Sequence, residues 1–355
     1  MVRCAKAMLQ YLRPTIRAMA GYAPGEQPQE DGFIKLNTNE SPYPPSPRVL
    51  EAIKQAATGE RLRKYPDPSG KAFRQAAARV LNVDPEGILI GNGSDDLLTI
   101  VTRAFVPEGG CIASPTPSYI LYAALAQIQG ARFESVPFTS DWRLPEPWPL
   151  RGRAHLTFLA NPNSPSGTMV DNEQLETLMA DLGSPLILDE AYVDFANTNG
   201  LDLVGKNPVI VTRSLSKSYG LAGLRFGFAV ADPATIRELN KVKDSYNCDA
   251  LSLAGAQAAL EDQDYFRTTR EKILASRARL FRELTALGFK VCPSQANFLW
   301  CRRPDKNAKS IYEELKRQRI LIRFMNYPGY GEGLRISVGS DAELDRLLDE
   351  LRRIL

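Results

Sequence analysis

Short apolar segments alternate with helical patterns from about residue 85 to about residue 230, and each apolar segment ends in polar residues. These segments read ILIGNG, CIASPTP, LTFLANPN, LILDEA and VIVTRSLSK, and stretches such as DDLLTIVTRAF and NEQLETLMADLG lie between them. Continuous apolar strands separated by helices are typical of a parallel sheet that is buried on both faces. The sequence therefore predicts an α/β fold with a mostly parallel sheet covered by helices on both faces.

The pattern changes after about residue 246, where long amphipathic helices such as REKILASRARLFRELTALG interleave with short strands such as ANFLWCR and LRISVG. This change predicts a smaller α+β domain. The first 22 residues are basic and contain no acid, which would suit a transit peptide, but they lack an uninterrupted apolar core, so we prefer an N-terminal arm. We predict an arm over residues 1–35, a large cofactor-binding domain over 36–245 and a small C-terminal domain over 246–355.

The composition limits the classes of function. A formal net charge of +3 with dispersed basic residues does not indicate nucleic-acid binding, and no apolar run is long enough to span a bilayer. Five cysteines without a CxxC pair indicate a reducing, cytoplasmic setting. The one histidine, His155, lies in an expected strand, so we expect neither a metal site nor proton transfer by imidazole.

Four groups of polar residues follow the apolar strands, at the sheet edge where parallel α/β folds bind ligands. GNGSDD opens a helix with Ser94 as its expected N-cap, and such a helix N-terminus binds phosphate readily. Asp189 ends an apolar strand, where a carboxylate is costly unless it meets a cation or a strong donor. Lys217 closes the motif SLSK, and residues 161–167 (NPNSPSG) form a turn with amides and hydroxyls.

Pyridoxal phosphate would satisfy all four groups. Lys217 would bond its aldehyde, Asp189 would keep its ring nitrogen protonated, and Tyr119 of TPSYILY would stack on its ring. Once a substrate displaces Lys217, the freed amine is the natural base for moving a proton, which replaces the missing imidazoles. The side chains and amides expected to hold the phosphate are Ser94, Asp95, Ser214, Ser216 and Arg225.

A nucleotide hydrolase is the alternative that LILDEA suggests, because P-loop proteins carry a similar apolar strand with acidic residues. That class needs a Gly-Lys pair followed by serine or threonine. Gly70-Lys71 is followed by alanine and Gly205-Lys206 by asparagine, so this alternative is excluded.

Eleven motifs occur in a fixed order along nearly the whole chain: GYAPGE, KLNTNESPY, KYPDPSG, GNGSDD, TPSYILY, NPNSPSG, LDEAYVDF, SLSKSYGLAGLRFG, ANFLW, ILIRF and LRISVG. In this order they resemble the fold-type I pyridoxal-phosphate aminotransferases, and within them the branch that acts on histidinol phosphate. The resemblance implies transamination between glutamate and 2-oxoglutarate, on one side, and histidinol phosphate and imidazole acetol phosphate, on the other, in histidine biosynthesis.

The resemblance also implies roles for single residues in cofactor binding. Lys217 would carry the cofactor, Asp189 would pair with its ring nitrogen, and Tyr192 would bond its ring hydroxyl oxygen. Gly93 would belong to the phosphate site. Tyr65 would reach the cofactor phosphate of a neighbouring subunit, which implies a homodimer.

Substrate contacts follow from the same resemblance. Arg335 would clamp the carboxylate of the amino donor, because its planar fork suits carboxylates. Tyr22 and Arg323 would meet the phosphate end of the substrate, and Asn39 would line the substrate site. Where the family has an asparagine before the proline of its turn, this chain has Ser164, and Asn161 or a water is expected to replace the missing contact.

Other substrates stay open at this point. Aromatic-amino-acid aminotransferases use the same scaffold, and threonine-phosphate decarboxylase resembles it closely. Arg323 suits histidinol phosphate and threonine phosphate equally. It therefore argues against an aromatic amino acid as substrate but does not distinguish between the two phosphorylated ones. A non-enzymatic regulator of this fold would carry a DNA-binding extension, for which we expect no room because the motifs begin by residue 22.

Overall fold

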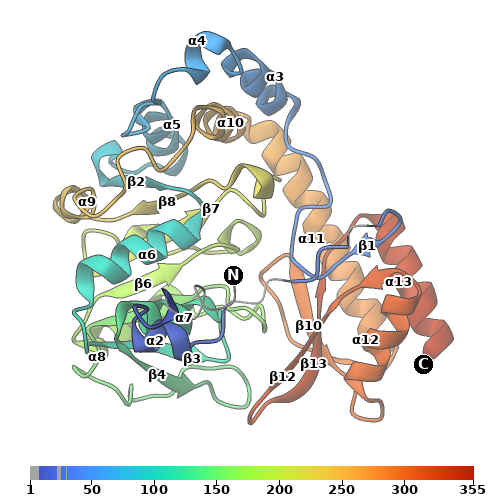
Figure 1. Cartoon of the computed structure of the whole chain (residues 1–355). Coiled ribbons are helices and arrows are strands. Elements are labelled where there is room, and N and C mark those ends of the chain that lie inside the picture. The colour runs from blue at the N-terminus through green and yellow to red at the C-terminus, as the bar shows by residue number, and fades with distance from the viewer. Residues whose placement is uncertain (1–7, 22–24, 29) are drawn as a thin grey trace.

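A seven-stranded sheet forms the centre of the computed structural model, which describes residues 8–21, 25–28 and 30–355 (Figure 1). Five adjacent strands run parallel, and β8 is antiparallel to both of its neighbours, β7 and β2. The strands in spatial order are β2 (Ile88–Gly91), β8 (Gly227–Val230), β7 (Val209–Ser214), β6 (Leu186–Asp189), β5 (Leu156–Ala160), β3 (Cys111–Thr116) and β4 (Arg132–Pro137). The predicted mostly parallel sheet is confirmed.

Helices cover both faces of this sheet because its inner strands are apolar on both sides. Ile187 and Ile210 face one layer, whereas Leu186, Leu188 and Val211 face the other. The first layer contains α6 (Ser94–Phe105), α7 (Leu121–Gln129) and α9 (Pro233–Leu239). The opposite side is covered by α8 (Asn172–Leu182) and, over β2 and β8, by α3 (Pro47–Ala56), α5 (Lys71–Leu81) and α10 (Ala250–Glu261). The predicted helical cover on both faces is confirmed.

The C-terminal part is built on a four-stranded antiparallel sheet (Figure 1). Its order is β12 (Arg323–Tyr327), β13 (Gly331–Ser337), β10 (Phe298–Arg302) and β9 (Lys290–Val291). Three helices pack against it through a shared apolar core: α11 (Gln263–Ala286), α12 (Ala308–Arg317) and α13 (Asp341–Ile354). Within the described ranges, no helix is both long and apolar enough to cross a membrane.

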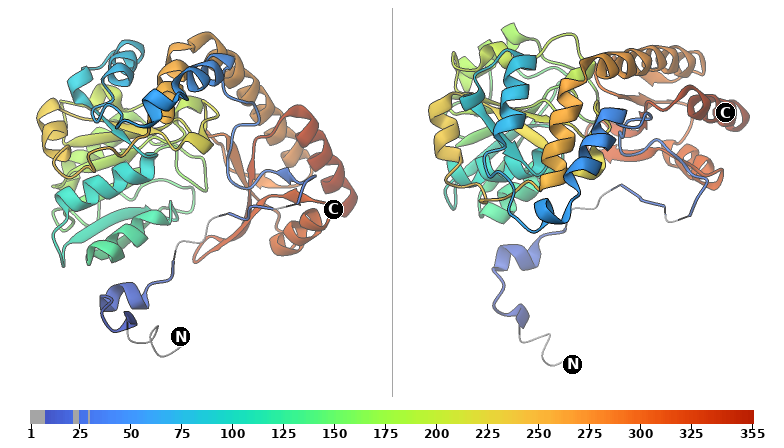
Figure 2. Two further views of the ribbon diagram at one scale, coloured as in Figure 1. Left: turned by 45° about the horizontal axis from the view of Figure 1, so that its top comes forward. Right: turned by 90° about the horizontal axis from the view of Figure 1, so that it is seen from above.

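Residues near the start of the chain pack with these C-terminal elements. β1 (Ile34–Lys35) pairs in parallel with β11 (Ile320–Leu321), and Leu36 is buried in the C-terminal core. The chain then crosses to α3 and α4 (Gly59–Leu62), which Figure 1 shows at the top of the molecule, next to α5 and α10. This path places residues 37–40 between the two sheets. Upstream, α2 (Pro14–Ala18) lies at the edge of the molecule in Figure 2, where Arg13 donates to the backbone carbonyl of Ile128 in α7.

Candidate active site

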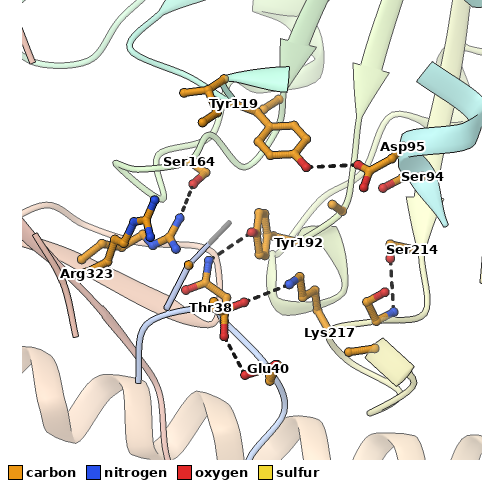
Figure 3. Close-up of a pocket in the computed structure, with 18 of the residues that line it drawn as sticks. Thr38, Glu40, Ser94, Asp95, Tyr119, Ser164, Tyr192, Ser214, Lys217 and Arg323 are labelled. Atoms are coloured by element: carbon orange, nitrogen blue, oxygen red, sulfur yellow. Dashed lines mark hydrogen bonds between the residues drawn. The ribbon is translucent and has the colours of Figure 1, made fainter. Parts of the chain in front are cut away.

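A cavity of about 340 Å³ lies between the carboxyl ends of the large sheet and strands β12 and β13. Figure 3 shows side chains from both sheets and from residues 37–40 converging on it. The predicted site residues that line it are Asn39, Ser94, Asp95, Tyr119, Ser164, Asp189, Tyr192, Ser214, Ser216, Lys217, Arg225, Arg323 and Arg335. The fold thus brings together residues that are widely separated in the sequence.

Lys217 lies in a tight turn after β7. The turn is fixed because Leu215 and Leu221 are buried and the amide of Leu215 donates to the carbonyl of Phe226. The amine of Lys217 points into the cavity and donates to the backbone carbonyl of Thr38 at 3.1 Å (Figure 3). It lies 5.8 Å from the ring centroid of Tyr192. The lysine therefore presents its amine where a small ligand can reach it.

Tyr192 and Asn39 form the wall beside this amine. Asn39 has a left-handed backbone conformation, with φ of 58°, and its side-chain amide donates to the Tyr192 hydroxyl at 3.0 Å. The backbone amide of Asn39 donates to the hydroxyl of Ser337 at 2.9 Å, and its carbonyl accepts from Asn297 at 3.0 Å. Asn39 thus ties the turn after β6 to the C-terminal sheet.

Asp189 ends β6 with its side chain buried at the cavity floor. Its carboxylate accepts from the Tyr122 hydroxyl at 2.8 Å and from the backbone amide of Ala191 at 3.3 Å. Burial raises the pKa of Asp189 to about 6, although the bond from Tyr122 opposes this rise. No ion pair among the described residues includes Asp189. A buried carboxylate in this setting suits a ligand that brings its own positive charge.

Tyr122 was not predicted as a site residue. It lies on α7, it is fully buried, and its ring stacks on Phe158 with centroids 4.7 Å apart. A buried tyrosine hydroxyl usually has a hydrogen-bond partner, and here that partner is Asp189. The only hint in the sequence is that Tyr122 follows Tyr119 by three residues, and the two rings do meet edge to face with centroids 5.6 Å apart.

The N-terminus of α6 forms an anion-binding corner. The expectation that Ser94 caps this helix is wrong, because Gly93 is the N-cap and Ser94 is the first helical residue. Gly93 has φ of 77° and leaves the first amides without a side-chain cap. A Cβ atom at Gly93 would lie 2.6 Å from Nη2 of Arg225, and the positive φ also favours glycine at this position. Arg225 also lies 3.4 Å from Asp95. Free amides and a guanidinium at one corner suit a phosphate group.

Two arginines line the opposite side of the cavity. Arg335 on β13 donates to the hydroxyl of Ser164 and to the carbonyl of Asn37, both at 2.9 Å. Arg323 on β12 lies directly across the strand pair from Arg335. Among the described residues no ion pair involves Arg323, which therefore faces the cavity without a carboxylate partner. This side can hold negatively charged groups of a substrate.

Three of the predicted site residues that the structure describes do not line the cavity. Gly93 lies directly behind Arg225. Asn161 is fully buried, and its side chain bonds the backbone of Val170 in both directions, at 2.8 and 2.9 Å, so it holds the turn together and does not line the cavity. Tyr65 is 80% exposed and stacks on Tyr246 with centroids 4.4 Å apart. Tyr22 lies outside the described residues.

A buried ionic group lies behind the cavity. Asp189 faces the ligand side of β6, and the next residue, Glu190, points to the opposite face. There the Nε atom of Arg213 donates to Glu190 at 3.0 Å, and Arg213 lies 3.8 Å from Asp194. Asp194 also accepts from Ser218, the neighbour of Lys217. The turns that carry Tyr192 and Lys217 are therefore joined from behind.

Helix α11 fixes the same region from the C-terminal side. Arg277 donates to the carbonyls of Phe195 and Ala296 at 3.2 and 2.9 Å. Arg270 donates to the carbonyls of Asp194 and Ala196. These bonds hold the short 3₁₀ turn that follows Tyr192 against the C-terminal part.

Comparison with known proteins agrees with this geometry. The family model for aminotransferase class I and II matches residues 31–351. The chain is 51% identical to histidinol-phosphate aminotransferase of Rhodopirellula baltica over 98% of this chain and 96% of that protein, and 47% identical to the same enzyme of Geotalea uraniireducens over 97% and 99%. The crystal structure of histidinol-phosphate aminotransferase from Sinorhizobium meliloti in complex with pyridoxal-5'-phosphate is similar with a TM-score of 0.85 and 30% identity, covering 97% of this chain and 98% of that one. The predicted family is confirmed: the chain belongs to the class I and II aminotransferases.

Proposed function

We propose that this chain transfers an amino group between L-glutamate and imidazole acetol phosphate, giving 2-oxoglutarate and histidinol phosphate, in histidine biosynthesis. The observation that carries this proposal is the convergence of an amine, a buried carboxylate and an anion-binding helix end in one cavity. Arg323 supports a phosphorylated substrate and disfavours the aromatic alternative. The names of the similar enzymes disfavour the decarboxylase alternative.

The residues of the cavity fit pyridoxal phosphate. Asp189 is a buried carboxylate without a cation, which suits a protonated ring nitrogen. The approach of Arg225 to Gly93, together with the uncapped amides of α6, suits the phosphate. The hydroxyls of Ser214 and Ser216 lie on the same side of the cavity, and Tyr119 offers a ring to stack on. When bound, this cofactor supplies an aldehyde that takes up an amine and a protonated ring that withdraws electrons from the substrate's α-carbon.

Lys217, Asp189 and Tyr192 can carry out the attachment of the cofactor, the proton transfer and the contacts to the cofactor ring. The amine of Lys217 would hold the cofactor and, once a substrate amine has taken its place, would accept the proton from the substrate's α-carbon. Asp189 in its ionised form would keep the ring nitrogen protonated. Tyr192 would donate its hydroxyl to the ring oxygen, and Asn39 orients Tyr192 through their 3.0 Å bond.

Substrate binding divides between the two arginines. Arg335 binds the α-carboxylate of glutamate, because its hydrogen bonds to Ser164 and Asn37 already orient the guanidinium group. Arg323 takes the distal anionic group, with Tyr22 as a further expected contact. The bond between Ser164 and Arg335 gives the serine a role in holding the arginine.

A homodimer completes the proposal. Tyr65 and Tyr246 form an exposed aromatic pair, and Leu50 and Leu62 nearby in the sequence are 57% and 59% exposed. Large apolar side chains on one surface favour contact with another protein surface. We propose that a second copy covers them and that Tyr65 reaches the partner's cofactor phosphate. The four described cysteines form no disulfide, which suits the cytoplasm.

Single-turnover absorbance of the cofactor-loaded protein tests the reaction. Histidinol phosphate, phenylalanine and threonine phosphate are mixed with it separately, and the products are analysed. We expect the absorbance of the lysine-bound cofactor to disappear rapidly with histidinol phosphate and to change slowly with phenylalanine. Carbon dioxide release from threonine phosphate would contradict the proposal.

Mixing two inactive variants tests the shared site. A Lys217→Ala subunit retains Tyr65, and a Tyr65→Ala subunit retains Lys217. If each site uses Lys217 from one subunit and Tyr65 from the other, a hybrid dimer contains one intact site. Activity should therefore appear on unfolding and refolding the two variants together. No gain over the separate variants would exclude a shared site.

A further inference from the structure

Tyr327 lines the substrate side of the cavity but has no role in the reaction described above. It lies on β12 with Arg323 and Met325, and the period of two along a strand places these three side chains on one face. All three line the cavity, as does Arg335 on the neighbouring strand. The face thus combines two guanidinium groups with one phenol.

The Tyr327 hydroxyl bonds a side chain on its own face of the strand. It donates to the sulfur of Met325 at 3.3 Å, and Met325 lies between Tyr327 and Arg323 in the strand. A thioether is a weak acceptor, so the hydroxyl loses little when it turns to a stronger one. Burial raises the pKa of Tyr327 to about 12, while the charges of Arg335 and Arg323 oppose the rise. The phenol therefore keeps its proton at neutral pH and can donate.

The number of oxygens on the ligand decides what this phenol can do. A carboxylate has two oxygens, and one arginine fork can satisfy both. A phosphate monoester has three terminal oxygens, so one arginine leaves the third without a donor from that fork. A hydroxyl on the same strand face as Arg323 can supply that donor, whereas a carboxylate does not need it.

We propose that Tyr327 donates a hydrogen bond to the phosphate group of the substrate and so selects a phosphorylated amine over a dicarboxylic amino acid. This inference rests on the function proposed above and names a further specificity-determining residue of the same site. Tyr327 fixes how tightly the phosphorylated substrate binds, whereas glutamate depends on Arg335 and Arg323 alone.

The variant Tyr327→Phe tests this role, because it removes the hydroxyl and keeps the ring that packs 6.0 Å from Trp300. We expect KM for histidinol phosphate to rise about tenfold, the factor that one hydrogen bond to a charged group contributes. KM for glutamate should change less than twofold. Tyr330→Phe is the matched control, because Tyr330 lies on the same hairpin and donates to the carbonyl of Phe138 outside the cavity.

Inorganic phosphate gives a second measurement that does not depend on the identity of the phosphorylated substrate. Phosphate should inhibit the half-reaction with glutamate, and Tyr327→Phe should weaken this inhibition about tenfold. Equal phosphate inhibition and equal KM for histidinol phosphate in both proteins would overturn the inference. A wild-type protein that does not react with glutamate would instead overturn the proposed function.

Discussion

Replacing Asp189 by asparagine should stabilise the cofactor-free protein while it removes activity. In the folded protein, burial raises the pKa of Asp189 from 3.8 to about 6. The folded state therefore binds this proton more tightly than the unfolded chain does, and stability falls as the pH rises from 4 through 6. A shift of about two pKa units corresponds to a cost of about 3 kcal/mol, which is present in full at pH 8.

Asparagine has the same shape without the charge, and it can still accept the bond from Tyr122. Asp189→Asn should therefore raise the free energy of unfolding of the cofactor-free protein by up to about 3 kcal/mol at pH 8. Near pH 4 the two proteins should differ little, because the wild-type carboxyl group is protonated in the folded state. Urea denaturation at pH 4.5 and pH 8, at one protein concentration, measures the difference.

With the cofactor bound, the wild-type protein should be more stable than Asp189→Asn. The wild-type protein gains the pairing between Asp189 and a protonated ring nitrogen, which the variant cannot make. We expect transamination by the variant to fall far more than its affinity for the cofactor. An equal stability difference at both pH values, or retained turnover in the variant, would refute the reasoning.

Three other substitutions examine groups around the cavity. Tyr122→Phe removes a donor to Asp189, so the pH midpoint of cofactor binding should move up by about one unit, as titration at several pH values would reveal. Glu190→Gln leaves the buried charge of Arg213 without its strongest partner and should cost about 3 kcal/mol or more in urea denaturation. Arg277→Met removes two bonds to backbone carbonyls, so we expect a loss of about 1–3 kcal/mol and a lower melting temperature. An unchanged pH midpoint in Tyr122→Phe, or an unchanged stability in Glu190→Gln or Arg277→Met, would contradict the corresponding prediction.

Local sequence patterns were sufficient for the strands and for the position of Lys217. Apolar runs such as LILD and VIVT favour buried strands. In a parallel sheet the residues that follow such strands lie at the same edge, the one formed by the carboxyl ends. The family resemblance added Arg323 and Arg335, whose pairing across β12 and β13 no local pattern indicates. The predicted domain boundaries and the roles of the single residues stay predictions.

Contacts between distant segments could not be predicted from local patterns. The bond from Tyr122 to Asp189 joins α7 to β6, and the direction of the Tyr327 hydroxyl depends on its bond to Met325. The cap of α6 was misjudged because serine is the commoner N-cap, whereas the N-cap position here has a φ of 77°, which favours glycine. The side chain of Asn161 forms hydrogen bonds with the backbone of Val170, and these bonds depend on the conformation of the turn between the two residues.

The pairing of β1 with β11 has a consequence for the order in which the protein matures during synthesis. The backbone carbonyl that accepts a hydrogen bond from the Lys217 amine belongs to Thr38, three residues after the end of β1. β1 gains its strand partner only when β11, close to the other end, has left the ribosome. The large sheet can form earlier, because its strands are all made before residue 231. A nascent chain that lacks the last elements should therefore contain the lysine in its turn but not the finished cavity, so cofactor loading should follow translation.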